Sequence, residues 1–284
     1  MPDGHYEIEY DIDPGEARFE TGVEGIRYDF NLGARVSIDK SLLPNNKFEI
    51  KYVDRDTGLL IQPRPHEFAD RVVAESEKVY HIHYGVEVMR NGEKIFSHVF
   101  NLENKNVHIE MMNTKGMGDA LCFMPYVEEF RKRHKCRVFV TIPSKFADIF
   151  RPVFKDITFL SGESADLNGR FVDDVWRDLP KDIYATYYYE VGYPAMPAMQ
   201  KTDLRMTGMM RNGANILGLD CLTEFKPRLA ASQNPKPKNV IRDAYVCISL
   251  KGTQPCKSWH NPEGWVKVVR FLKDKGYRVL CIDG

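Results

Sequence analysis

The fold is decided by the stretch Met111-Met112-Asn113-Thr114-Lys115-Gly116-Met117-Gly118-Asp119-Ala120-Leu121. An alternating apolar run, Val107, Ile109 and Met111, leads into its Gly-x-Gly turn, and a helical pattern follows the turn. Alternation of this kind is typical of a strand, and the whole order indicates a strand, a tight turn and a helix. The turn is therefore expected at the C-terminal end of a parallel strand, where α/β sheets bind their ligands.

Asp119 is expected in the first turn of that helix. Gly116 and Gly118 allow the backbone to bend tightly and let a ligand approach it without clashing with a Cβ atom. One interpretation makes Asp119 a catalytic base. The other makes it an ordinary N-cap, because aspartate is preferred at helix starts, and the spacing alone favours the cap.

The length and charge of the chain limit its partners. The chain has 284 residues, enough for two or three domains, and its 40 basic and 40 acidic residues give a net charge of zero. Nucleic acid and anionic membranes usually bind proteins with a basic excess, so neither is expected as the main partner. The N-terminus has no signal pattern and no apolar run reaches membrane-spanning length, so we expect a soluble cytoplasmic protein without membrane insertion.

The cysteines show no metal-binding or disulfide pattern. No CxxC pair occurs, and most of the cysteines lie in apolar runs, which predicts reduced thiols in the core. The six residues are Cys122, Cys136, Cys221, Cys247, Cys256 and Cys281.

Residues 1–105 are predicted to form a small antiparallel β domain used for interaction. Short alternating runs are separated by turn signals, among them Asp54 to Gly58 and the pair Asn91-Gly92, a strong hairpin signal. His81 and His83 are two residues apart and would share a strand face. They are interpreted as an ordinary polar face, and the alternative is a pair of metal ligands without a third.

Residues 106–222 show the order strand, helix, strand, helix, strand, which is the pattern of a parallel Rossmann-like sheet. The first helix contains Pro125, which predicts either a kink or a later start. Ser144 is expected to cap the second helix, over residues 144–153. A later strand over residues 182–190 carries three consecutive tyrosines, Tyr187 to Tyr189, which either stack on a ligand or simply form an aromatic strand.

Residues 223–243 contain several prolines and are predicted to be a linker, and residues 244–284 begin a second Rossmann-like domain. Asn261 is expected to cap a helix that has Pro262 at its first position. The loop before it contains Lys251, Thr253 and Lys257, and a lysine beside a helix N-terminus can neutralise a diphosphate, although loop lysines are usually only solvated. A single strand-helix-strand unit is incomplete and would need about a hundred more residues.

Together, these features resemble the GT-B glycosyltransferases and, more closely, the bacterial autotransporter heptosyltransferases, which are related to the lipopolysaccharide heptosyltransferases. An N-terminal β domain favours the autotransporter branch. The matching residues are Gly116-Met117-Gly118-Asp119-Ala120-Leu121, the helix from Pro125 to Phe130, Leu217-Gly218-Leu219, Glu224-Phe225-Lys226-Pro227, Lys257-Ser258-Trp259-His260-Asn261-Pro262-Glu263-Gly264-Trp265, Gly276-Tyr277-Arg278-Val279, Gly25-Ile26-Arg27-Tyr28-Asp29-Phe30-Asn31 and the turn from Asp54 to Gly58.

The resemblance implies an inverting transfer of heptose from ADP-heptose to serine hydroxyls of autotransporter adhesins. It also implies a homo-oligomer and a ferric ion, Fe(3+), held by four cysteines. Those ligands are expected beyond Gly284, so no metal site is placed on this chain. No catalytic divalent metal is expected, because neither candidate loop contains an Asp-x-Asp pair.

The implied roles fall on two loops. Asp119 would be the catalytic base, and Lys257 would neutralise the leaving diphosphate. Gly116, Met117, Gly118, Lys251 and Thr253 would assist donor or phosphate binding. The alternatives are a lipopolysaccharide-type heptosyltransferase, another nucleotide-sugar transferase, and a non-enzymatic assembly or adaptor module.

Overall fold

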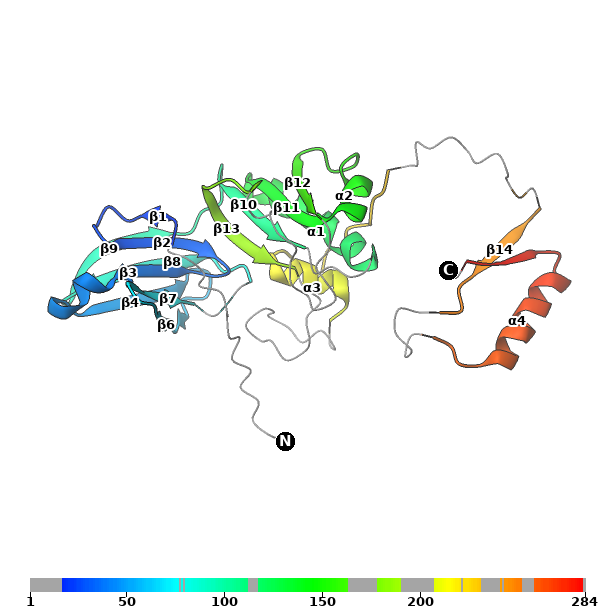
Figure 1. The fold of residues 1–284 in the computed structure, drawn as a ribbon, viewed down its shortest axis with the longest axis horizontal. Coiled ribbons are helices and arrows are strands. Elements are labelled where there is room, and N and C mark those ends of the chain that lie inside the picture. Colours follow the sequence, from blue (N-terminus) through cyan, green and yellow to red (C-terminus); the bar gives the residue numbers. More distant parts are fainter. Residues whose placement is uncertain are drawn as a thin grey trace, which may run out of the picture. The chain divides into compact units, whose positions relative to one another are not determined.

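The computed structural model describes residues 17–76, 78, 80–111, 117–162, 178–189, 207–220, 222–230, 241, 243–251 and 258–282. The chain divides into two compact units, residues 1–230 and 231–284 (Figure 1). The boundary between them lies within residues 223–243, where the sequence predicts a linker.

The larger unit contains a nine-stranded sheet in the order β12-β11-β10-β13-β2-β3-β7-β6, with β1 paired to β2 (Figure 1). The predicted parallel sheet is confirmed, since five neighbouring strands are parallel: β12 (Ile157–Gly162), β11 (Arg137–Pro143), β10 (Asn106–Glu110), β13 (Ile183–Tyr188) and β2 (Ile26–Asn31). The antiparallel strands are β1 (Phe19–Glu20), β3 (Arg35–Asp39), β7 (Arg71–Glu75) and β6 (Arg64–Glu67). The sequence did not predict that β2, from the N-terminal section, pairs with β13.

A second, four-stranded antiparallel sheet completes the N-terminal section, in the order β5-β4-β8-β9. Its strands are β5 (Leu60–Ile61), β4 (Phe48–Asp54), β8 (Tyr84–Arg90) and β9 (Glu93–Val99), and a 3₁₀-helix η1 spans Lys40–Asn45. The predicted hairpin is confirmed: Asn91 and Gly92 join β8 to β9 with φ of 55° and 86°. Both sheets contribute to one core, because the rings of Phe30 and Tyr84 stack with centroids 5.9 Å apart.

A buried ion pair fastens β2 to β3. Arg35 donates to both carboxylate oxygens of Asp29, from Nε at 2.8 Å and from Nη2 at 2.7 Å. Both side chains are at most 2% exposed. A bidentate geometry of this kind satisfies two charges that water cannot reach.

Three helices belong to the larger unit: α1 (Met117–His134), α2 (Ser144–Phe150) and α3 (Met209–Ile216). Of the two expectations for Pro125, a kink or a later helix start, the later start is wrong, because α1 begins at Met117 and Pro125 lies buried inside it. Proline costs one helical hydrogen bond there, which the packing of the buried face of α1 offsets. Ser144 is not the cap of α2: Pro143 occupies that position, and the Ser144 hydroxyl donates to the Gly162 carbonyl at 3.1 Å.

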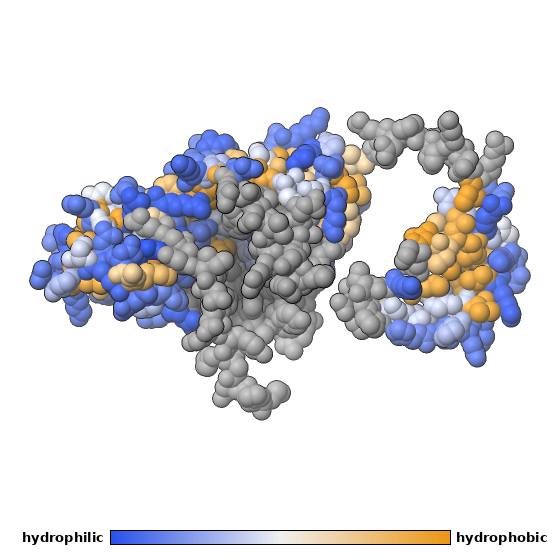
Figure 2. All heavy atoms as spheres, in the orientation of Figure 1, coloured by the Kyte–Doolittle hydropathy of each residue, from blue (hydrophilic) through white to orange (hydrophobic). Residues whose placement is uncertain are grey.

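The smaller unit is a strand-helix-strand motif, with β14 (Tyr245–Ile248), α4 (Pro262–Asp274) and β15 (Arg278–Cys281). The predicted cap is confirmed, since Asn261 accepts from the Gly264 N–H at 2.8 Å and Pro262 follows it. Cys247 and Cys281 are exposed, so the prediction of core thiols is wrong for both, whereas Cys136 is buried. Two strands and one helix bury too little surface to enclose them. Figure 2 shows apolar residues gathered in the middle of this unit.

None of the helices in the described ranges has the length and apolar character that crossing a membrane requires.

Candidate active site

Asp119 lies where the sequence predicts, in the first turn of α1. The strand before that turn, β10, is flanked on both sides by parallel strands, β11 and β13. The intervening residues 112–116, including the predicted Gly116, lie outside the described residues. The half-buried Asp119 therefore stands at the carboxyl end of a central parallel strand, the position expected for a ligand-binding residue.

Asp119 is not the N-cap of α1. The helix begins at Met117, so Asp119 is its third residue. Among the described residues, no side chain or backbone group donates a hydrogen bond to the Asp119 carboxylate. A negative charge in the first helical turn is favourable, but this carboxylate is not committed to capping and can face a substrate.

Gly118, beside Asp119, has open space above it. A Cβ atom built on Gly118 would meet no heavy atom within 4 Å, and its φ is not in the left-handed region. Neither the backbone conformation nor the packing of the chain requires glycine here. The surface beside Asp119 is therefore open to a ligand, while Met117 is half-buried and packs against the core.

Helices α1 and α3 lie side by side and run in the same direction. Near their middles, a Cβ atom on Gly213 would lie 2.8 Å from Phe123 Cδ1. Near their C-terminal ends, the His81 N–H donates to the Ile216 carbonyl at 2.8 Å, and the His81 ring lies 6.0 Å from that of Phe130. The N-terminal ends of both helices consequently lie at the same end of the sheet as Asp119.

Tyr187 of β13 and Tyr189, which directly follows that strand, belong to the core. Tyr187 and Tyr189 are buried, and the ring of Tyr189 stacks on Phe123 with centroids 4.5 Å apart. The Tyr189 hydroxyl donates to the Gly213 carbonyl at 2.6 Å, and burial raises its pKa well above the ordinary value. The interpretation as an aromatic strand is confirmed for Tyr187, and Tyr189, directly after the strand, is likewise buried, so neither is available for stacking on a ligand.

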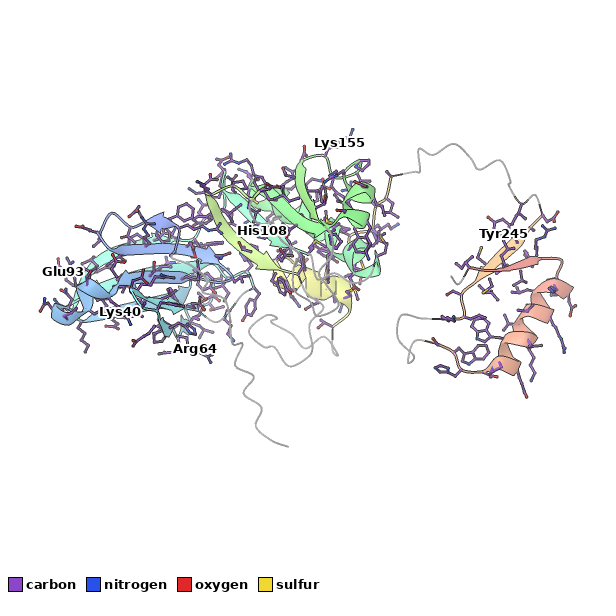
Figure 3. The ribbon with its side chains drawn as sticks, viewed as in Figure 1. Lys40, Arg64, Glu93, His108, Lys155 and Tyr245 are labelled. Atoms are coloured by element: carbon purple, nitrogen blue, oxygen red, sulfur yellow. The ribbon has the colours of Figure 1, made fainter. Side chains whose placement is uncertain are left out.

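A buried polar group on β10 and β11 was missed at the sequence level. His108 and Glu110 alternate with the apolar residues of β10, and His108 lies in the middle of the larger unit (Figure 3). His108 Nε2 lies 2.9 Å from Thr141 Oγ1, and Thr141 donates to the Glu110 carboxylate. Burial, with a contribution from Arg18, lowers the pKa of His108 to about 3, so its ring is neutral at pH 7. The sequence signal was the polar residue at every second position of an otherwise apolar strand.

His81 and His83 do not form a metal site. They lie in a loop rather than on a strand face, and they have different partners. His81 Nδ1 lies 2.9 Å from the Tyr187 hydroxyl, and His83 Nδ1 lies 3.0 Å from an Asp56 carboxylate oxygen. In the part of the chain that the structure describes, no group of three or more His, Cys, Asp or Glu residues could hold a metal ion.

The predicted donor-side residues lie on the smaller unit. Lys251 follows β14 and is exposed, while Thr253 and Lys257 fall outside the described residues. After them, the Trp259 and Trp265 rings meet edge to face with centroids 5.2 Å apart, directly before and within the first turn of α4. A Cβ atom on Gly264 would lie 2.3 Å from the Trp259 ring, so this ring occupies the space that glycine leaves.

Comparison with known proteins shows which proteins the chain is similar to. Residues 22–92 match the family model of the N-terminal domain of glycosyltransferase TibC. The autotransporter heptosyltransferase BAHTCr of Citrobacter rodentium is 33% identical over 275 residues, which cover 96% of this chain and 60% of the relative. The chain is homologous to the autotransporter heptosyltransferases. The predicted resemblance is thus confirmed.

A solved autotransporter heptosyltransferase has the same fold. TibC of Escherichia coli is also one of the curated relatives. It was solved as a dodecameric iron-containing heptosyltransferase in complex with ADP-D-beta-D-heptose. Its structure matches with a TM-score of 0.75 and 32% identity, over 96% of this chain and 64% of that chain.

Not every heptosyltransferase homologue is active. The inactive autotransporter heptosyltransferase BimC of Burkholderia thailandensis is 28% identical over 271 residues, 95% of this chain and 58% of its own length. The present chain spans about 60% of the length of the curated relatives it matches.

Proposed function

We propose that this chain is part of an enzyme that transfers heptose from ADP-heptose to serine hydroxyls of an autotransporter adhesin in the cytoplasm. The observation that carries the proposal is the Asp119 carboxylate, which accepts no hydrogen bond from the described residues and stands beside the open Gly118 backbone at the end of β10. The TibC complex with ADP-D-beta-D-heptose supports the choice of donor.

In the proposed reaction, Asp119 acts as the general base. A serine hydroxyl is a weak nucleophile, so a carboxylate that accepts its proton in the transition state lowers the barrier. The serine oxygen bonds to the anomeric carbon of heptose while the bond from that carbon to the ADP oxygen breaks. A single displacement of this kind inverts the configuration at the anomeric carbon.

The leaving ADP carries a developing negative charge, which positioned cations and N–H groups stabilise. We assign this role to Lys257, with Lys251 and Thr253 as further ligands on the smaller unit. Gly116, Met117 and Gly118 would present backbone groups to the donor from the larger unit. No divalent metal takes part in this scheme.

The proposal includes a GT-B architecture. The parallel part of the larger unit would be the first Rossmann-like domain, and the smaller unit would begin the second. The antiparallel strands of residues 1–105 would bind another subunit or the acceptor. By analogy with TibC, the whole protein would be an iron-containing homo-oligomer, with the iron ligands beyond residue 284.

The test compares Asp119→Ala and Lys257→Ala with the unaltered full-length protein. Heptose transfer to the adhesin is measured by mass spectrometry and ADP-heptose affinity by calorimetry. Asp119→Ala is expected to abolish transfer and keep donor affinity, whereas Lys257→Ala is expected to weaken donor binding and slow transfer. Asp148→Ala is the matched control, because Asp148 is exposed on α2 and its ion-pair partner among the described residues is Arg151. Full transfer by Asp119→Ala would exclude it as the base.

The inactive relative BimC keeps a second function open, that of an assembly or adaptor module. Such a module would bind the adhesin without consuming ADP-heptose. Absence of both donor binding and transfer in the unaltered protein would favour this alternative. A lipid acceptor and other nucleotide sugars, tested in the same assay, distinguish the remaining transferase alternatives.

A further inference from the structure

Asn212 of α3 is a buried amide that the fold does not use. Its side chain is fully buried, and neither its amide nitrogen nor its carbonyl oxygen has a hydrogen-bond partner in the described structure. Buried polar side chains are nearly always hydrogen-bonded, and an unsatisfied one destabilises the protein that carries it. An apolar residue would serve helix packing better, so the amide calls for an explanation outside the packing of the fold.

Asn212 lies near the N-terminal end of α3, at the end of the sheet where Asp119 lies. It is the fourth residue of α3, which begins at Met209. Helical side chains lean toward the helix N-terminus, so the amide of Asn212 lies over the first turn of α3. That turn is at the same end of the sheet as the first turn of α1, because the two helices are parallel and Gly213 contacts Phe123, one turn after Asp119.

We propose that Asn212 is an acceptor-binding residue that hydrogen-bonds a peptide group of the adhesin next to the serine activated by Asp119. This inference rests on the proposed function. A carboxamide offers one acceptor and two donors, which match the N–H and C=O of a main-chain peptide group. The acceptor is favoured over the donor because Asn212 and Asp119 belong to neighbouring helices of one unit, and Asp119 is assigned to the acceptor hydroxyl.

Burial of the amide has a kinetic consequence. Both polar atoms of Asn212 are shielded from solvent in the absence of ligands. Acceptor binding must therefore be accompanied by a rearrangement that exposes them. Binding that requires such a rearrangement is slower than docking to a preformed surface.

The decisive variant is Asn212→Leu, which keeps the size of the side chain and removes both polar atoms. The expected result in the full-length protein is an increase of the KM for an adhesin peptide by about tenfold, with unchanged ADP-heptose affinity and an equal or higher Tm. The matched control is Thr186→Val. Thr186 also has a buried hydroxyl without a partner, on β13, and its replacement is expected to change neither KM nor donor affinity.

Asn212→Ala is the second variant, and it is used if the leucine side chain prevents the protein from folding. An unchanged acceptor KM in whichever variant folds would overturn the inference and leave the amide as the ligand of a buried water. An equal loss of donor affinity would also overturn it. These outcomes differ from failure of the proposed function. In that case the unaltered protein neither transfers heptose nor binds the peptide, and the inference about Asn212 is then wrong as well.

Discussion

Gly118 gives the sharpest test of where the substrate approaches, because replacing it by alanine is expected to stabilise the fold. The residue is the second of α1, its φ is not in the left-handed region, and a methyl group there would meet no heavy atom within 4 Å. Gly118→Ala therefore introduces no clash within the described structure. A loss of activity in this variant would therefore indicate contact between the new methyl group and a ligand.

The stability of Gly118→Ala can be predicted from helix propensity. Alanine is more favourable than glycine in a helix by about 0.5–1 kcal/mol, chiefly because it restricts the unfolded chain. For a unit of this size the gain corresponds to a Tm increase of about 1–4 °C. We expect transfer activity to fall by about tenfold or more, since a ligand bound at the helix end approaches the backbone closely.

The assay pairs thermal unfolding with steady-state transfer kinetics on the full-length protein. Gly92→Ala is the matched control: its Cβ position is also open, but its φ of 86° strains alanine. This control is expected to lose stability and keep activity, the reverse of Gly118→Ala. If Gly118→Ala gains stability and keeps full activity, no ligand approaches this side of α1 and the placement of the substrate beside Asp119 is wrong.

Two further predictions concern stability. Asp29→Asn removes the carboxylate that pairs with the buried Arg35 and is expected to lower the free energy of unfolding by about 3–5 kcal/mol. Asp70→Asn removes an exposed carboxylate that pairs with Arg71 and should change the free energy of unfolding by less than about 1 kcal/mol in denaturant titrations. Similar small effects of both substitutions would show that the buried pair contributes little. Burial is the main cause that lowers the pKa of His134 to about 4. The unfolded chain therefore binds a proton at this histidine below about pH 6.5, whereas the folded chain binds it only near pH 4, so the free energy of unfolding decreases as the pH falls through this window. His134→Phe is expected to reduce that loss in unfolding experiments between pH 7 and 4, and an unchanged pH dependence would exclude His134 as its source.

Local patterns predicted most of the individual elements. The alternation before the Gly-x-Gly turn identified β10, and Asn91-Gly92 identified the β8–β9 hairpin, because a period of two and positive-φ residues are properties of short segments. The pairing of β2 with β13 was not predictable in this way. It joins residues more than 150 positions apart, and an apolar alternation does not specify which strand will be its neighbour.

The candidate site was predictable only in part. The glycines and the aspartate of the turn indicated that Asp119 lies near a helix start. They did not indicate that Asp119 is not the N-cap, because this depends on the helix beginning two residues earlier, at Met117. Asn212 could not be recognised at all from the sequence. What distinguishes it is the absence of a partner for both polar atoms, which only the packing around α3 reveals.

The pairing of β2 with β13 makes the N-terminal strands a structural part of the parallel sheet. Along the sheet, β2 is separated from β10 by β13 alone, so it lies only about 10 Å from the strand that leads to Asp119. Deleting residues 1–105 would remove β2, one of the two neighbours of β13, and leave β13 as an open, aggregation-prone edge strand. A protein bound by β3, β7 or β6 would be attached through continuous backbone hydrogen bonds rather than a flexible tether, so its distance from Asp119 would be set by the sheet itself.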